Sequence, residues 1–436
     1  MKHYIFSFLG AGLLLCLQPA QAQNAQKFSV DGISIILKPT VKDIINVSVY
    51  YRGGVTNYEA DKAGIEGAAL AGTAECGTKL YSKDAFKNKA DKFGIDISGS
   101  STYDYGTITL NCISKYFDEG WSLLAEAVKN PVYNENDFNL LKEKLISGIK
   151  QSESNPDNKI QRMALANTFK GTPYAIDPDG EVSTITNLTA SDAKDYYYNT
   201  LLNKNRMFIV IAGKISREEI TAKVKKAFDD LPSKSYTAYT YHTPDIITDS
   251  PNIESRKLAT NYIVGTFNAP AFTSEDYIIN RIAVGVLSDN LFKEIRTKRN
   301  LSYAPYASVE TLEMPCGFVY VSTTDPKASV EVMVNEINRL KTKGFSQKEL
   351  NGIKNLFITS NYMKQESTDR MAASLGTDEI LGNWKMNEEL IGRIQKVTPA
   401  DMTNDFNKYI HGINWNYLGD EKAADDAKDA FSMPVK

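Results

Sequence analysis

Two similar segments about 210 residues apart constrain the fold of this 436-residue chain more than any other feature. The segment NLTASD (residues 187–192) and the segment KVTPAD (residues 396–401) both open a predicted helix. A long helical region precedes each of them, over residues 137–169 and 347–375, and carries a Lys-Gln-Ser or Lys-Gln-Glu-Ser segment. Because this repeat is far longer than a solenoid unit, it predicts a duplicated α+β domain.

We therefore expect an α+β protein with two homologous domains, each a mixed or antiparallel sheet covered by helices. The expected N-terminal domain covers residues 27–235 and the C-terminal domain covers residues 254–420. Residues 236–253, which contain two prolines and many Ser, Thr and Tyr residues, are the expected linker, and residues 421–436 the expected flexible tail. The length supports this division, because a mature chain of about 410 residues is too long for one hydrophobic core.

Hydrophobic periodicity places the individual elements. Alternation between apolar and polar residues predicts strands at residues 33–37 and 47–51 and a strand pair over residues 95–112. An alanine-rich helix is expected at residues 63–74. The other expected elements are helices at 83–93 (capped by Ser82), 117–129 and 135–152 (capped by Asn134), and a buried strand at 207–213.

The N-terminal residues predict export. Lys2 is followed by an apolar run at residues 4–17 that is too short to span a bilayer comfortably, and the segment PAQA (residues 19–22) provides a small-residue cleavage site. We expect a secretory signal cleaved after Ala22, which places the mature chain in the periplasm. Lipid anchoring at Cys16 is a less favoured alternative, because the residue before it is a bulky leucine. No later stretch is long and apolar enough for stable membrane insertion.

The composition excludes several classes of function. A net charge of −3 without a basic run argues against a nucleic-acid partner. Cys76, Cys112 and Cys316 have an odd count and no C-x-x-C spacing, so neither a disulfide framework nor a cysteine zinc site is expected, although any one pair could bond. His242 and His411 are isolated among polar neighbours and are expected to be solvated or capping residues. We therefore expect no metal and no other cofactor in this chain.

The element order and two local segments resemble the insulinase/pitrilysin family of zinc peptidases. The first segment starts with AGI at residue 63 and ends with CGT at residue 78, like the zinc-binding helix of the family and the Gly-Thr pair after it. The second segment is IRTKRNLSY at residues 295–303, in the expected C-terminal domain. The resemblance covers nearly the whole mature chain, and it implies the two-domain fold of the family.

The zinc ligands of this family are replaced in this chain. Catalytic members carry H-x-x-E-H on the first helix, where two histidines one turn apart bind the metal and the glutamate acts as a base. The corresponding window here is GAALA, from Gly67 to Ala71, and alignment on the Gly-Thr pair gives Ala68, Ala71 and Gly72 instead. The third ligand of the family falls on Gly148. All ligands are absent together, which favours a site lost during evolution.

The resemblance implies functional residues in two other places. In the family, an arginine and a tyrosine of the second segment face the zinc across a closed chamber, hold the substrate and stabilise the oxyanion. These residues match Arg296 and Tyr303, with Arg299 as the alternative arginine. The family also binds extended peptides by adding them to a sheet edge. The matching polar strand carries Ser98, Gly99, Ser100 and Ser101.

These features favour a non-catalytic subunit of a periplasmic zinc peptidase. Some family members consist of two chains, one with the zinc motif and one with the Arg/Tyr pair, and this chain resembles the second. We expect a homologous partner subunit that carries H-x-x-E-H and the zinc, and a peptide or unfolded polypeptide as substrate. The alternative is a stand-alone peptide-binding or scaffold protein without proteolytic activity. An active metallopeptidase with unusual ligands is disfavoured, because Glu66, just outside both windows, is one carboxylate and cannot hold the metal alone.

Overall fold

The computed structural model describes residues 24–435 of the chain. The expected signal peptide, with Cys16 and the cleavage site at Ala22, lies outside the described residues. In the part of the chain that is described, no helix is both long and apolar enough to cross a bilayer. Cys76, Cys112 and Cys316 are buried free thiols, so no pair among these three is bonded.

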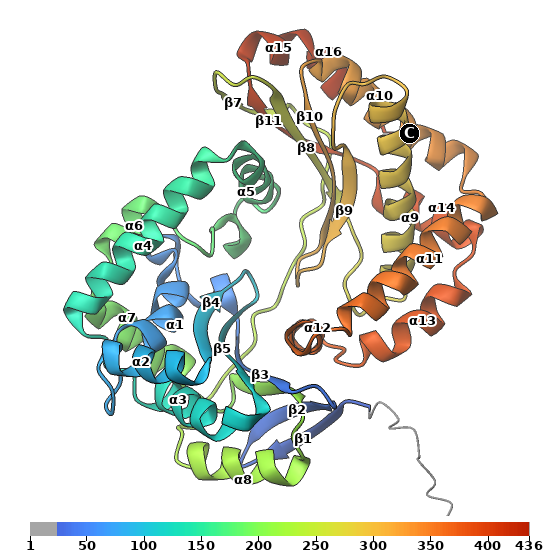
Figure 1. Cartoon of the computed structure of the whole chain (residues 1–436). Helices are drawn as coiled ribbons and strands as arrows, with labels where there is room; N and C mark the ends of the chain where they lie inside the picture. Colours follow the sequence, from blue (N-terminus) through green and yellow to red (C-terminus); the bar gives the residue numbers. More distant parts are fainter. Residues whose placement is uncertain (1–23, 436) are drawn as a thin grey trace, which may run out of the picture.

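Two mixed sheets form the centres of the two halves of the molecule (Figure 1). The first sheet has the order β1-β2-β6-β3-β5-β4 and the second the order β7-β11-β8-β10-β9. In each sheet one pair is parallel, β2 with β6 and β7 with β11, and the other pairs are antiparallel. The strands are β1 (Gln26–Val30), β2 (Ile33–Pro39), β3 (Ile44–Arg52), β4 (Asp96–Ser101), β5 (Tyr105–Ile113), β6 (Met207–Gly213), β7 (Asn252–Ser255), β8 (Asn261–Asn268), β9 (Tyr306–Glu310), β10 (Cys316–Thr323) and β11 (Asn414–Gly419).

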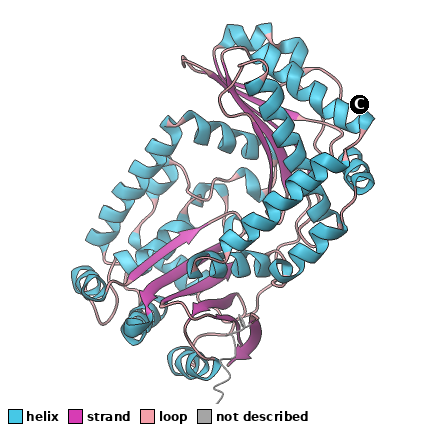
Figure 2. Cartoon of the chain, turned by 45° about the vertical axis from the view of Figure 1, so that its right-hand side comes forward, coloured by secondary structure: helices cyan, strands magenta, loops and turns pink. Residues whose placement is uncertain are grey.

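Helices flank both sheets (Figure 2). Those of the first half are α1 (Ile65–Glu75), α2 (Lys83–Phe93), α3 (Phe117–Lys129), α4 (Glu135–Ser154), α5 (Pro156–Thr168), α6 (Val182–Asn187), α7 (Ala190–Tyr196) and α8 (Arg217–Phe228). Those of the second half are α9 (Asp276–Leu291), α10 (Pro326–Lys343), α11 (Gln347–Lys364), α12 (Thr368–Ile380), α13 (Met386–Lys396), α14 (Pro399–Tyr409), α15 (Glu421–Asp426) and α16 (Lys428–Phe431). The expected fold class, an α+β protein with two homologous halves, is confirmed.

The repeated segments start equivalent helices in the two halves. Thr189 is the N-cap of α7 and Thr398 the N-cap of α14, and in both a capping box forms with the aspartate three residues later. The threonine hydroxyl accepts a hydrogen bond from the aspartate N–H, and the aspartate carboxylate accepts one from the threonine N–H. The predicted caps Ser82 and Asn134 also accept hydrogen bonds from the first turns of α2 and α4. The same local chemistry therefore sets corresponding elements of both halves.

One helix of each half packs on the sheet of the other half. Helix α5 places Ile160 and Ala164 against Phe318 and other residues of the second sheet. Its counterpart α12 places Leu375 against Tyr50 and other residues of the first sheet. Each of the two predicted long helical regions is interrupted just before the helix that packs on the other half, α5 or α12. In the first region the interruption comes at the proline that begins α5. The two halves therefore share their apolar cores by reciprocal exchange of a helix.

The hairpin tips of the two sheets meet between the halves. Asp104, in the turn between β4 and β5, is buried and accepts a hydrogen bond from the N–H of Glu313, in the turn between β9 and β10, at 3.3 Å. The buried hydroxyl of Tyr174 also donates to Asp104. Burial and the nearby Glu313 carboxyl raise the pKa of Asp104 to about 8. The contact between the two hairpins thus centres on a carboxyl whose neutral form is favoured by burial.

Two of the expected domain limits need correction. The prediction of a flexible tail over residues 421–436 is wrong, because this segment forms α15 and α16, and Phe431 is fully buried against Trp415 and Tyr417. Strand β7 begins inside the expected linker. The rest of that linker lacks regular structure but is fixed, because Ile246 is buried and its N–H donates to Asn268 Oδ1 at 2.9 Å.

Candidate functional site

Helix α1 occupies the place expected for the zinc-binding helix, and one face of it is accessible. Gly67, Ala71 and Glu75 are partly exposed at intervals of four residues, while the residues between them are buried. The alternative alignment is disfavoured because a Cβ at Gly72 would lie 2.7 Å from the ring of Tyr133. A Cβ at Gly67, in contrast, would meet no atom closer than 3.9 Å. The accessible face therefore matches the window from Gly67 to Ala71, which offers no side chain that can bind a metal.

The surroundings of this face also lack metal ligands. Gly148, at the expected third position, lies on α4, which packs on α1. Glu75 lies one turn after Ala71 on α1, and Lys144 lies one turn before Gly148 on α4. Glu75 pairs with Lys144 at 3.5 Å and with Lys87 of α2 at 2.8 Å. Across residues 24–435 no group of three or more His, Cys, Asp or Glu side chains is placed to hold a metal ion. The residues present therefore do not fit a zinc ion at this site.

The two histidines lie in the linker or beside it. His411 Nε2 is 2.7 Å from Asp245 Oδ1, where the C-terminal half meets the linker, and His242 lies in the linker itself.

The strand that carries Ser98, Gly99, Ser100 and Ser101 is β4, and it lies at the edge of the first sheet. Ser98 and Ser100 are exposed, whereas Gly99 and Ser101 face α1. A Cβ at Gly99 would overlap the carbonyl of Leu70, so a glycine is needed there for close packing of strand and helix. Two of the four residues thus remain open to a ligand on the exposed face, and the unpaired edge runs along the whole strand.

Sequence reasoning missed the structural role of Glu66. This residue is the second of α1, and it is fully buried. Its carboxylate accepts hydrogen bonds from Tyr196 Oη at 2.6 Å, Asn57 Nδ2 at 2.9 Å and Ser101 Oγ at 3.0 Å. Burial raises the pKa of Glu66 to about 7, although these hydrogen bonds and Arg206 act to lower it. The available signal was a carboxylate in the first turn of an alanine-rich helix, followed by eight residues without a charge, but its partners are distant in the sequence.

Arg296 and Tyr303 lie together on the surface of the second half. Arg296 belongs to η6 (Phe292–Thr297), a π-helical turn that continues α9. Its guanidinium carbon lies 4.1 Å from the centroid of the Tyr303 ring and 4.9 Å from that of Phe292, so the cation sits between two aromatic rings. The Tyr303 side chain is 77% exposed. Among residues 24–435 the guanidinium makes no hydrogen bond or ion pair, so its N–H groups are free to donate to a ligand.

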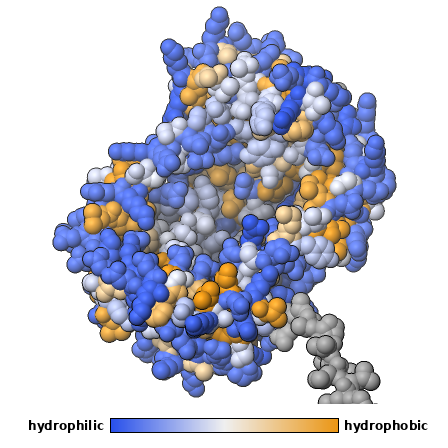
Figure 3. Space-filling view, in the orientation of Figure 1, coloured by the Kyte–Doolittle hydropathy of each residue, from blue (hydrophilic) through white to orange (hydrophobic). Residues whose placement is uncertain are grey.

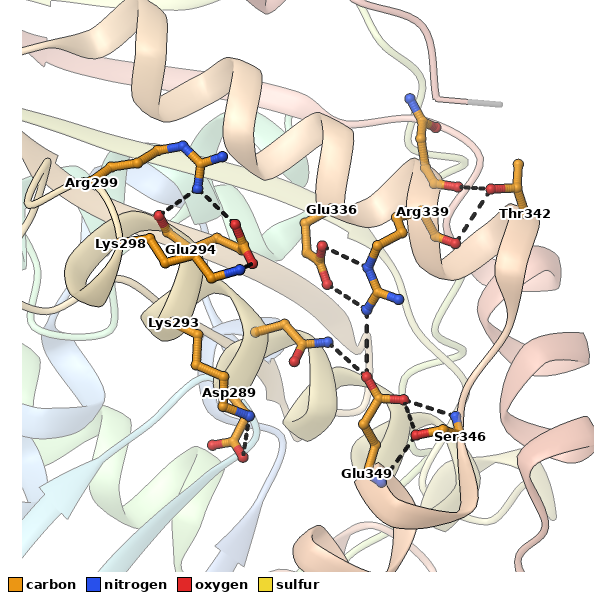
Figure 4. A network of polar contacts seen from close by, with 12 residues as sticks. Asp289, Lys293, Glu294, Lys298, Arg299, Glu336, Arg339, Thr342, Ser346 and Glu349 are labelled. Carbon is orange, nitrogen blue, oxygen red and sulfur yellow. Dashed lines mark hydrogen bonds and ion pairs between the residues drawn. The ribbon is translucent and has the colours of Figure 1, made fainter.

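Arg299, the alternative arginine, is engaged elsewhere. It donates to a carboxylate oxygen of Glu294 at 2.7 Å and to the Glu294 carbonyl at 2.8 Å. Lys298 binds the same carboxylate at 2.6 Å, and Figure 4 shows both cations directed toward Glu294. The geometry therefore brings Arg296, and not Arg299, into contact with Tyr303.

Profiles of one peptidase family match much of the chain. The profile "Insulinase (Peptidase family M16)" matches residues 70–177, and the profile "Peptidase M16 inactive domain" matches residues 187–357. The chain is 21% identical to the "Non-peptidase homolog YmxG" of Helicobacter pylori over 424 residues, which cover 95% of this chain and 97% of that protein.

Solved structures show the same fold. A peptidase M16 inactive domain from Pseudomonas fluorescens superposes with a TM-score of 0.81 at 17% identity, covering 91% of this chain and 98% of the other. The periplasmic protease PqqL from Escherichia coli matches with a TM-score of 0.75 at 14% identity, covering 97% of this chain but only 49% of PqqL. The two profile matches show that the chain belongs to the insulinase (M16) family of peptidases, as a member whose helix α1 carries none of the zinc ligands of the family.

Proposed function

We propose that this chain is the non-catalytic subunit of a two-chain zinc peptidase in the periplasm. The observation that carries the proposal is the division of functional groups. Helix α1 has no side chain that can bind zinc, whereas Arg296, which is partly exposed, contacts the exposed ring of Tyr303. Two features support it. PqqL, a periplasmic protease, is about twice as long as the matched region. The face drawn in Figure 3 is hollowed between the two halves, as expected for one wall of a chamber.

The proposed role of the pair follows from its chemistry. The guanidinium of Arg296 is held between rings but keeps its N–H groups free, and Tyr303 presents a phenol donor beside it. Fixed donors of this kind stabilise negative charge that develops on a substrate carbonyl oxygen. The zinc and the general base belong to the partner, a homologous subunit with H-x-x-E-H. The substrate is a peptide or unfolded polypeptide that adds to the edge strand β4.

Co-purification with such a partner and peptidase assays of the complex test this proposal. The variants are Tyr303→Phe, which removes the phenol donor, and Arg296→Lys, which removes the planar guanidinium. Arg299→Lys is the matched control, because Arg299 is a neighbouring arginine that is bound to Glu294. We expect each of the first two variants to lower the rate of the complex about 10- to 100-fold and the control to change it less than twofold. Equal rates for all three in a verified complex would remove the pair from the mechanism.

A second candidate is a stand-alone peptide-binding protein, and the position of β4 at a sheet edge favours it. In this case the isolated chain would bind extended peptides, no zinc-bearing homologue would co-purify, and added zinc would cause no hydrolysis. Isothermal titration of the isolated chain with a peptide, with and without zinc, separates the two candidates when combined with the co-purification.

A further inference from the structure

The buried carboxyl of Glu66 connects α1 to the edge strand proposed to bind peptides. Its three donors come from three different elements: Tyr196 ends α7, Asn57 lies in the loop after β3, and Ser101 is the last residue of β4. No side chain separates Glu66 from β5, because Gly106 lies there and a Cβ on it would be 2.8 Å from Glu66 Oε1. Glu66 therefore holds the end of β4 at a fixed position relative to two helices.

The directions of these hydrogen bonds are determined by the neighbours. Asn57 Oδ1 accepts from Arg206, so its Nδ2 faces Glu66 and can only donate. Asn57 Nδ2 and Tyr196 Oη both donate to Glu66 Oε2, whereas Ser101 Oγ donates to Oε1. Among the described residues Tyr196 Oη has no other acceptor, so a proton on Oε2 would leave the tyrosine hydroxyl without a partner, and the favoured position for a proton on the carboxyl is Oε1. It would then donate to Ser101 Oγ and reverse this hydrogen bond, leaving Thr102 O, at 3.4 Å, as the acceptor for the Ser101 hydroxyl.

Few charged groups surround Glu66. The positive charge of Arg206 favours the ionised form of Glu66, and its guanidinium also donates to Asn57 Oδ1. Tyr58 has a buried hydroxyl without a hydrogen-bond partner among the described residues. The titratable and charged groups that act on Glu66 or on the residues around it are Tyr58, Tyr103, Tyr196, Tyr236, Arg52, Arg206, Asp177, Asp179 and Glu313.

We propose that Glu66 is a positioning residue for the peptide-binding edge: its carboxylate holds Ser101 and thereby keeps β4 in the conformation that accepts an added strand. This inference rests on the proposed peptide binding at β4. A strand that is already fixed loses less entropy when a peptide binds, so the ionised form of Glu66 binds peptides more tightly than the protonated form. Since the pKa of Glu66 is about 7, the change falls between pH 6 and pH 8.

Glu66→Gln tests this role because it imitates the protonated form with the same shape. The amide oxygen accepts from Asn57 and Tyr196, and the amide N–H₂ donates to Ser101. Ser101→Ala removes the hydroxyl from the other side. The matched control is Asp405→Asn in the second half. Asp405 is also a buried carboxyl whose pKa is raised to about 7, but it accepts from Asn280 Nδ2 at 2.7 Å, between α14 and α9.

Hydrogen exchange of the β4 amides in the ligand-free chain is the first measurement. Variants are compared with the wild type at the same pH, so that the intrinsic pH dependence of exchange cancels. At pH 8 we expect β4 to exchange about fivefold faster in Glu66→Gln and Ser101→Ala than in the wild type, because a hydrogen bond to a charged acceptor is lost. At pH 6 Glu66→Gln and the wild type should agree within twofold, and Asp405→Asn should match the wild type throughout. A Glu66→Gln variant that exchanges like the wild type at pH 8 overturns the proposal.

Peptide affinity is the second measurement. The probe is a fluorescent ten-residue peptide of alternating valine and threonine with blocked ends, which has no group that titrates between pH 6 and pH 8. The wild type should bind it about fivefold more weakly at pH 6 than at pH 8, and Glu66→Gln should show no such change. Wild-type pH dependence in Glu66→Gln contradicts the proposal. If no variant binds the peptide while exchange follows the expected pattern, peptide binding at β4 is refuted and the control of β4 by Glu66 stands.

Discussion

Replacement of Gly376 by alanine tests the reciprocal exchange of helices between the halves. Gly376 lies in the middle of α12 and is buried against the first sheet. A methyl group on it would overlap the ring of Tyr50, well inside the roughly 3.5–4.0 Å that separates carbon atoms in contact. The ring cannot yield, because it is stacked on Phe208 at 4.8 Å and packed against Tyr105 at 5.2 Å. Helix α12 must therefore move away from the sheet.

The expected magnitude follows from two opposing effects. Alanine in place of glycine within a helix stabilises by about 1 kcal/mol. Overpacking in a tight core costs about 1–3 kcal/mol. Gly392, in α13, is the matched control: it is exposed, and a Cβ there would meet no atom within 4 Å. Gly392→Ala should thus stabilise the protein by up to about 1 kcal/mol, and Gly376→Ala should be about 1–3 kcal/mol less stable than that control.

Urea denaturation of both variants, followed by tryptophan fluorescence and circular dichroism, measures this difference. Agreement between the two probes is needed, because a chain of two halves can unfold in steps. If Gly376→Ala is as stable as Gly392→Ala, then α12 does not pack tightly on the first sheet, and the reasoning about shared cores fails.

Two further predictions concern the contact between the halves and the lost metal site. Burial raises the pKa of Asp104 from 3.8 to about 8, so between these pH values the folded state holds a proton that the unfolded state releases, and the unfolding free energy should fall as pH rises. Asp104→Asn should reduce this pH dependence by up to about 1.4 kcal/mol per pH unit. Calorimetry at several pH values measures it, and the same pH dependence in the variant and the wild type would contradict the prediction. The combined variant Gly67→His, Ala71→His and Gly148→Glu should bind one zinc ion per chain, since Cβ atoms at both glycines have room. Elemental analysis measures the zinc content. A content equal to that of the wild type would show that α1 and α4 do not keep the geometry of a zinc site.

Local structure was largely predictable because local chemistry determines it. The apolar run at residues 207–213 is the central strand β6, and all its residues are buried, as its composition indicated. The caps Ser82 and Asn134 and the paired capping boxes depend on residues within one turn. For the same reason the duplication was visible in the sequence: the cap chemistry is kept in both halves.

Long-range packing was not predictable from one sequence. Nothing local indicates that α12 leaves its own sheet to cover Tyr50, since its apolar residues would suit either sheet. A flexible tail was expected over residues 421–436, but Phe431 is fully buried against Trp415 and Tyr417, two residues of β11 whose position depends on the fold. In the candidate site, sequence spacing left two arginines open, and the fold distinguishes them: Arg296 contacts the Tyr303 ring, whereas Arg299 is paired with Glu294. The partners of Glu66 come from distant segments and required the fold.

Reconstitution from separate chains tests whether one active site is divided between this chain and a zinc-bearing homologue. Peptide hydrolysis is measured for the zinc-bearing homologue alone, with this chain, and with this chain carrying both Arg296→Lys and Tyr303→Phe. We expect the homologue alone to be nearly inactive and this chain to restore hydrolysis. The double variant should form the complex but restore at most about one-tenth of the rate. A homologue that is fully active alone, or a double variant that restores the full rate, would contradict it.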